Sequence, residues 1–64
     1  MKKQMNNFKR LRLLQGMTAI EASEALGIPV AVYYHYESGA RLPNIKRLQH
    51  IAKFYGVTID ELLK

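Results

Sequence analysis

The most constraining feature of this chain is a very short link between two short helices in its first half. Thr18 followed by Glu21 predicts a helix start, because the hydroxyl can accept from the Glu21 amide while the carboxylate returns to the Thr18 amide. Gly27 is placed to end that helix. Pro29 suits the start of a second helix over about residues 30–38, because it lacks an N–H that would find no partner in the first turn. With so short a turn between them, the two helices must cross steeply.

Three further helices are predicted around this helix-turn-helix, and no strand. The first begins near Asn6 or Asn7 and stops at Gly16. A fourth follows Asn44 and stops at Gly56, and the spacing of Thr58 and Glu61 predicts a short fifth. We therefore expect an all-α protein, a compact five-helix bundle over residues 6–64, preceded by a flexible basic tail over residues 1–5.

Helical periodicity also predicts which side chains form the core. In the first helix, Phe8, Leu11 and Leu14 are expected on one apolar face. The predicted core comprises Leu11, Leu26, Ile28, Tyr33, Tyr36, Leu48, Ile51, Ala52, Leu62 and Leu63.

Charge and composition narrow the function classes. The 64 residues carry ten Lys and Arg against five Asp and Glu, a net charge of +5 that fits nucleic acid, an anionic membrane surface or simply a solvated surface. No Lys or Arg lies between Leu13 and Ala40. Any phosphate contact from a positively charged side chain must therefore come from residues before or after that segment. Two histidines and no cysteine argue against a zinc site, and we expect no metal and no cofactor.

Neither a catalytic constellation nor a targeting segment is visible. The chain shows no phosphate-cradling glycine loop and no nucleophile–base pair, so we expect no enzymatic activity. No apolar run approaches the ~18 residues of a membrane span, and no hydrophobic stretch follows the basic N-terminus. The apolar face of the first helix is needed for the core, which argues against membrane-surface binding. We expect a cytoplasmic protein with no membrane partner.

Short motifs follow one another along about residues 8–63: Leu11-Arg12, Gly16-Met17-Thr18, Leu26-Gly27-Ile28, Tyr36-Glu37-Ser38-Gly39, Arg41, Pro43, Gly56-Val57-Thr58 and Asp60-Glu61-Leu62-Leu63. No single motif is specific, but the ordered set resembles the phage Cro/repressor-type (XRE-like) helix-turn-helix domain. The resemblance implies a lambda repressor-like DNA-binding fold. It also implies a small prokaryotic or phage regulator of transcription, a repressor, that binds double-stranded DNA in a sequence-specific manner.

The resemblance further implies a role for individual residues. The third helix would lie in the major groove, which admits one α-helix. The residues facing the bases would be Val30, Ala31, Tyr34 and His35. The residues holding phosphates would be Thr18, Ser38 and Arg41, the first at a helix N-terminus that favours anions. Arg12 and Glu37 match positions that form a structural ion pair in family members.

Departures from the family pattern fall in the DNA-reading region. The family usually opens the second helix with Gln, where this chain has Ala19. It usually caps the third helix with Ser or Thr and continues with polar residues, where this chain has Pro29-Val30-Ala31-Val32. Small apolar side chains cannot hydrogen-bond to bases, but they can pack on the C5-methyl of thymine. We therefore expect thymines opposite Val30 and Ala31.

Several alternatives stay open. The apolar stretch of the third helix also fits a protein-interaction module that kept the fold and lost base reading, and the antitoxin of a toxin–antitoxin pair is a close variant. Tyr34 and His35 fit DNA contacts or plain surface positions; Tyr34 also fits a protein contact, and His35 also fits a pH switch. Lys46 and Arg47 fit contacts to flanking DNA or a solvated helix. A homodimer on DNA would need contacts from the fourth and fifth helices, or cooperative binding.

Overall fold

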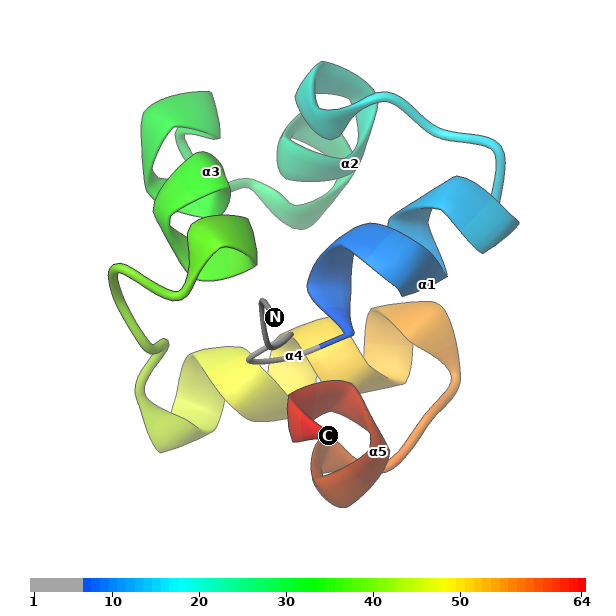
Figure 1. The fold of residues 1–64 in the computed structure, drawn as a ribbon, viewed down its shortest axis with the longest axis vertical. Coiled ribbons are helices and arrows are strands. Elements are labelled where there is room, and N and C mark those ends of the chain that lie inside the picture. The colour runs from blue at the N-terminus through cyan, green and yellow to red at the C-terminus, as the bar shows by residue number, and fades with distance from the viewer. Residues whose placement is uncertain (1–6) are drawn as a thin grey trace, which may run out of the picture.

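The computed structural model describes residues 7–64 and folds them into helices without strands, as predicted (Figure 1). The helices are α1 (Phe8–Leu14), α2 (Ala19–Leu26), α3 (Val30–Ser38), α4 (Ile45–Tyr55) and α5 (Ile59–Leu63). α3 packs against α1 and α2, while α4 packs against α2 and α5. The predicted basic tail over residues 1–5 lies outside the described residues. No helix among residues 7–64 has the length and apolar character that crossing a membrane requires.

Both predicted capping boxes are present and set where α2 and α5 begin. At α2, Thr18 Oγ1 accepts from the Glu21 amide at 3.1 Å, and the Thr18 amide donates to Glu21 Oε1 at 2.9 Å. At α5, Thr58 and Glu61 repeat the same two bonds at 3.0 and 3.1 Å. Each box satisfies two amides that a helix start would otherwise leave without partners.

The start of α1 is held differently from the prediction. Asn7 is the N-cap residue, but its side chain makes no capping hydrogen bond. Asn7 Nδ2 instead donates to the Glu61 carbonyl at 2.7 Å, and the Asn7 amide donates to the Leu62 carbonyl at 2.9 Å. These two hydrogen bonds connect the start of α1 to α5. They fix the position of α5 in the bundle, although α5 has only five residues.

The predicted apolar face of α1 is wrong at one position. Phe8 is fully buried and Leu11 is partly buried against the core, but Leu14 is 70% exposed. The reason is geometric, because a helix turns about 100° per residue, so a residue six positions on lies about 120° away from the first. Arg12, four positions after Phe8, occupies the inward position that the prediction gave to Leu14.

Aromatic rings from three helices fill the centre of the bundle. Phe8 of α1 stacks on Tyr33 with ring centroids 6.4 Å apart and meets Tyr36 edge-on at 6.0 Å. The hydroxyls of Tyr33 and Tyr55 hydrogen-bond at 2.6 Å, which joins α3 to α4. Burial raises the pKa of both Tyr33 and Tyr55 above the ordinary tyrosine value. Both hydroxyls are therefore satisfied as neutral groups.

Most of the predicted core is buried. Leu11 and Leu63 are the exceptions, because they are only partly buried and pack at its margin. The apolar core residues that the predicted core set omitted are Phe8, Ala19, Ala22 and Tyr55. Two of these are alanines, whose small side chains carry little periodic signal.

Candidate nucleic-acid interface

The turn between α2 and α3 fixes how the third helix is presented. Only residues 27–29 separate the two helices. Gly27 ends α2 in the left-handed region at φ +73°, where a residue with a Cβ is strained. The Ile28 amide then donates to the Ser23 carbonyl at 2.9 Å, and the Ile28 side chain is 4% exposed. The turn is therefore anchored in the core and leaves α3 at one angle to α2.

α3 has a buried side and an open side. Tyr33 and Tyr36 face the core, as expected from their helical spacing. The four predicted base-facing residues lie on the open side, where one is partly exposed and three are exposed: Val30, Ala31, Tyr34 and His35. Val30 and Tyr34 are four residues apart, as are Ala31 and His35, so each pair shares one strip of the helix and the two strips lie next to each other on the open side. Val32 does not belong to it, because it packs partly against the core.

Of the three predicted phosphate-binding residues, Ser38 and Arg41 lie at and just beyond the C-terminal end of α3, and Thr18 lies at the start of α2. Thr18 caps α2, and its side chain is exposed. Ser38 ends α3, and its hydroxyl donates to the His35 carbonyl at 3.2 Å and accepts from the Ala40 amide at 3.3 Å. The exposed Arg41 donates its own amide to the same His35 carbonyl at 3.2 Å. The hydroxyl of Ser38 thus shapes the loop that carries Arg41.

The expected ion pair between Arg12 and Glu37 is present and holds α3 from behind. Arg12 Nε donates to Glu37 Oε2 at 2.6 Å, and Arg12 Nη2 donates to Glu37 Oε1 at 3.2 Å, which is a bidentate geometry. A third donor, Nη1, reaches the Met17 carbonyl at 3.0 Å. The hydrogen bonds to Glu37 raise the pKa of Arg12 above its ordinary value, against the opposing effect of burial. One guanidinium therefore connects α1, α3 and the loop that leads into α2.

Two further positioning residues, both on α4, were not predicted. Arg47 Nη1 donates to the Tyr36 hydroxyl at 3.1 Å, so this side chain braces α3. His50 Nε2 lies 3.1 Å from the Leu26 carbonyl at the end of α2, and since a carbonyl only accepts, Nε2 is the donor. The sequence pattern shows both as polar positions on an amphipathic helix. No spacing rule relates them to partners that lie 11 and 24 residues away.

Ala19 has a structural explanation. Its side chain is 6% exposed and belongs to the core, directly after the Thr18 cap. The position where the family usually has a polar residue is therefore filled by packing between helices.

Comparison with known proteins agrees with this geometry. A model of the helix-turn-helix family matches residues 8–62, which includes every helix of the fold up to Leu62. The chain belongs to the helix-turn-helix family. The resemblance to the phage Cro/repressor-type (XRE-like) members of the family is confirmed.

Individual helix-turn-helix proteins match most of this chain. It is 31% identical over 58 residues to the cryptic phage CTXphi transcriptional repressor RstR of Vibrio cholerae, covering 91% of this chain and 52% of that protein. It is 38% identical over 55 residues to the HTH-type transcriptional activator BcrR of Enterococcus faecalis, covering 86% and 27%. An uncharacterized HTH-type transcriptional regulator of Bacillus subtilis, YqaE, is 36% identical over 58 residues, covering 91% and 50%.

The chain thus spans about half the length, or less, of these curated relatives. No solved structure matches the chain with significance.

Proposed function

We propose that the chain binds double-stranded DNA as a transcription regulator and that α3 enters the major groove. Membership of the helix-turn-helix family supports DNA binding, and the names of the relatives support transcription regulation. One relative is named a repressor and another an activator, so the direction of regulation is a separate question. We favour repression, because the repressor is matched over the larger share of its length.

The observation that carries the proposal is the two-sided character of α3. A helix with its side chains is about 10–12 Å wide, and the major groove is about 12 Å wide. α3 offers an open face of four residues, while Arg12, Arg47 and the core hold its other side. A helix presented in this way enters the groove without rearrangement.

Base reading on this face combines apolar and polar contacts. Val30 and Ala31 would pack on thymine methyl groups, whereas Tyr34 and His35 can hydrogen-bond to base edges. Thr18, Ser38 with its neighbouring amides and Arg41 would contact phosphates, which fix the register of the domain but carry no sequence information. Sequence-dependent shape of the duplex would supply the remaining specificity.

A pair of copies suits this mode of binding. Helix-turn-helix dimers read two half-sites whose recognition helices lie about 34 Å apart. The Cα trace measures 31 × 22 × 20 Å, so two copies fit side by side on one face of a duplex. We propose a homodimer on DNA that reads a site with two-fold symmetry.

The test is a selection from random duplex DNA with the purified domain at low and at physiological salt. We expect an enriched two-fold symmetric site with T·A pairs under Val30 and Ala31. Affinity should fall steeply between the two salt concentrations, because Lys and Arg contacts release counterions from the phosphates. A selected site without T·A pairs at those positions would refute the thymine reading, and enrichment of no sequence would refute specific binding.

Two substitutions distinguish contacts to bases from contacts to phosphates. Arg41→Ala should weaken binding by a similar factor on every sequence and should lower the salt dependence by about one counterion. Tyr34→Ala should instead change which bases are enriched under the middle of α3. Lys53→Ala is the control, since Lys53 lies in the last turn of α4 and is assigned no DNA contact.

A further inference from the structure

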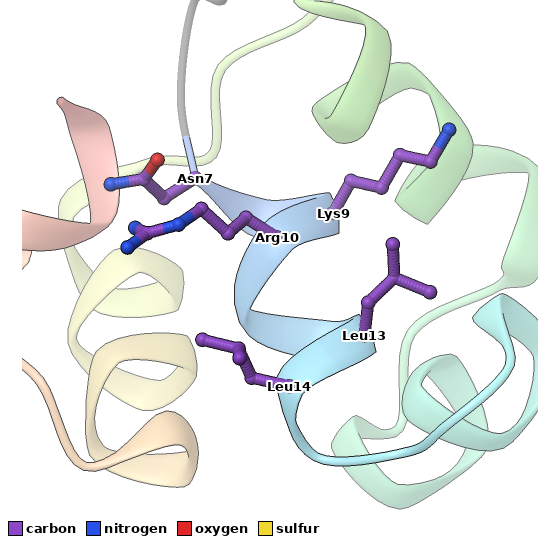
Figure 2. A pocket seen from close by; sticks show the side chains of 5 residues that line it. All are labelled: Asn7, Lys9, Arg10, Leu13 and Leu14. Atoms are coloured by element: carbon purple, nitrogen blue, oxygen red, sulfur yellow. The ribbon is translucent and has the colours of Figure 1, made fainter.

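The outer side of α1 carries two leucines that the fold leaves uncovered. Leu13 is 57% exposed and Leu14 is 70% exposed, although the opposite side of the same helix is buried. Together with Asn7, Lys9 and Arg10 they line a hollow of about 640 Å³ (Figure 2). We call this surface the α1 face. None of its residues belongs to the proposed DNA contacts.

The α1 face repeats one pattern twice. Lys9 and Leu13 are four residues apart, as are Arg10 and Leu14, so each leucine lies one turn beyond a cation on the same strip of the helix. In Figure 2, Arg10 and Leu14 point to the side of α4 and α5, while Lys9 and Leu13 point to the side of α2 and α3. The hollow therefore has an apolar end and a cationic end.

The two cations of the α1 face are available to a partner. Neither Lys9 nor Arg10 forms an ion pair with a carboxylate among residues 7–64, and α1 itself contains no Asp or Glu. The carboxylate of Glu37, on the neighbouring α3, is already bound in two places by Arg12. The rim of the hollow is thus positively charged and uncompensated.

We propose that the α1 face docks an acidic, leucine-bearing helical segment of a partner protein. Such a segment would place apolar side chains against Leu13 and Leu14 and carboxylates against Lys9 and Arg10, which matches both the hydrophobic and the electrostatic character of the surface. DNA has the charge for this surface, but its thymine methyl groups lie in the major groove, where the proposed binding mode places α3. A flat anionic membrane fits less well, because the surface is hollowed and presents only two leucines. This proposal goes beyond DNA binding.

The test is an NMR titration of the ¹⁵N-labelled protein with two designed helical peptides. One peptide carries Leu and Glu at alternating turns of one face, and the matched peptide carries Lys in place of every Glu. We expect saturable shifts centred on α1 with the Glu peptide and none with the Lys peptide. The double variant Leu13→Ser with Leu14→Ser, and the single variant Arg10→Glu, should each weaken binding by about tenfold or more, which corresponds to about 1.4 kcal/mol.

Matched controls lie elsewhere on the surface. Leu42→Ser with Ile45→Ser removes two leucine-sized side chains of similar exposure, 68% and 61%, and Lys53→Glu reverses a charge on α4. These controls should change the affinity for the Glu peptide by about twofold at most. Lys9 is left unchanged, because it also borders a smaller hollow that contains Tyr34 and Ser38 of α3.

Three outcomes would overturn the proposal: no saturable shifts with the Glu peptide, shifts centred on another helix, or equal loss of affinity in the control variants. Binding to phosphatidylglycerol vesicles that depends on Leu13 and Leu14, without peptide binding, would assign the face to lipid instead. Circular dichroism and thermal melting test whether each variant is folded, and neither measurement involves DNA. The peptide titration also contains no DNA, so a failure of the DNA proposal is distinguishable from a failure of this one.

Discussion

At the scale of single residues, Arg12 is the charged residue of the described part of the chain that is buried. It is 8% exposed and its three donors reach two different segments. A buried guanidinium left without its carboxylate is costly, because the charge is then neither hydrated nor paired.

We therefore expect Glu37→Gln to lower the free energy of unfolding by about 3 kcal/mol. Chemical denaturation monitored by circular dichroism measures this. The double variant Arg12→Met with Glu37→Leu should lose much less than the two single changes added together, since no stranded charge remains. Additive losses in that cycle would mean that the two side chains act independently and that their ion pair contributes little to stability.

The Tyr33–Tyr55 pair predicts how stability depends on alkaline pH. Burial raises the pKa of both phenols in the folded protein, while the unfolded chain ionises near the ordinary value of 10.0. The pair thus contributes stability fully below pH 10 and loses it as the pH rises further, because only the unfolded state releases these protons.

Thermal melts between about pH 9 and pH 11 check this prediction. The melting temperature of the wild type should fall over that interval, and Tyr33→Phe with Tyr55→Phe should fall less steeply from a lower starting value. Parallel curves would attribute the alkaline loss to lysines instead.

At the scale of helices, the two capping boxes provide a matched comparison. Thr18 and Thr58 make the same pair of hydrogen bonds, but only Thr18 is proposed to contact DNA. Thr18→Ala and Thr58→Ala should each lower stability by about 1 kcal/mol. Gel-shift titrations should show weaker DNA binding for Thr18→Ala only. Equal DNA affinity of the two variants would remove Thr18 from the phosphate contacts.

Helix boundaries were the most predictable part of this fold. Capping residues and terminal glycines act within a few residues along the chain, so α2, α3 and α4 begin and end as their local signals indicate, and α5 begins as its capping box indicates. The inward face of α1 was less predictable. Arg12 replaces an apolar residue there because Glu37, 25 positions away, neutralises it. Here the resemblance to a family supplied what periodicity could not.

The candidate site also has one part that the sequence predicts and one part that it does not. The open side of α3 follows from helical spacing around Tyr33 and Tyr36, which the sequence displays. The braces from Arg47 and His50 depend on how α4 crosses α2 and α3, and that crossing is set by tertiary packing rather than by any local pattern.

At the scale of the whole molecule, a chain of 64 residues has little stability to spare, roughly 3–10 kcal/mol. Phe8→Ala leaves a cavity beside two tyrosine rings and should cost about 3–5 kcal/mol, enough to unfold much of the protein. Leu14→Ala, on the exposed side of the same helix, should change stability by about 0.5 kcal/mol or less. Denaturation curves of the two variants measure the contrast, and similar losses would contradict the assignment of the inward face.

The contacts that hold α3 in place affect how the cost of fitting protein to DNA is shared between the two molecules. α3 is attached to α1 through Arg12, to α4 through Arg47 and Tyr55, and to α2 through a turn anchored by Ile28. In the proposed binding mode, the protein would meet its DNA site as a stiff template and would lose little conformational entropy on contact. Any misfit must be absorbed by bending or twisting of the duplex. Operator base pairs that the protein never touches would then set affinity through their flexibility.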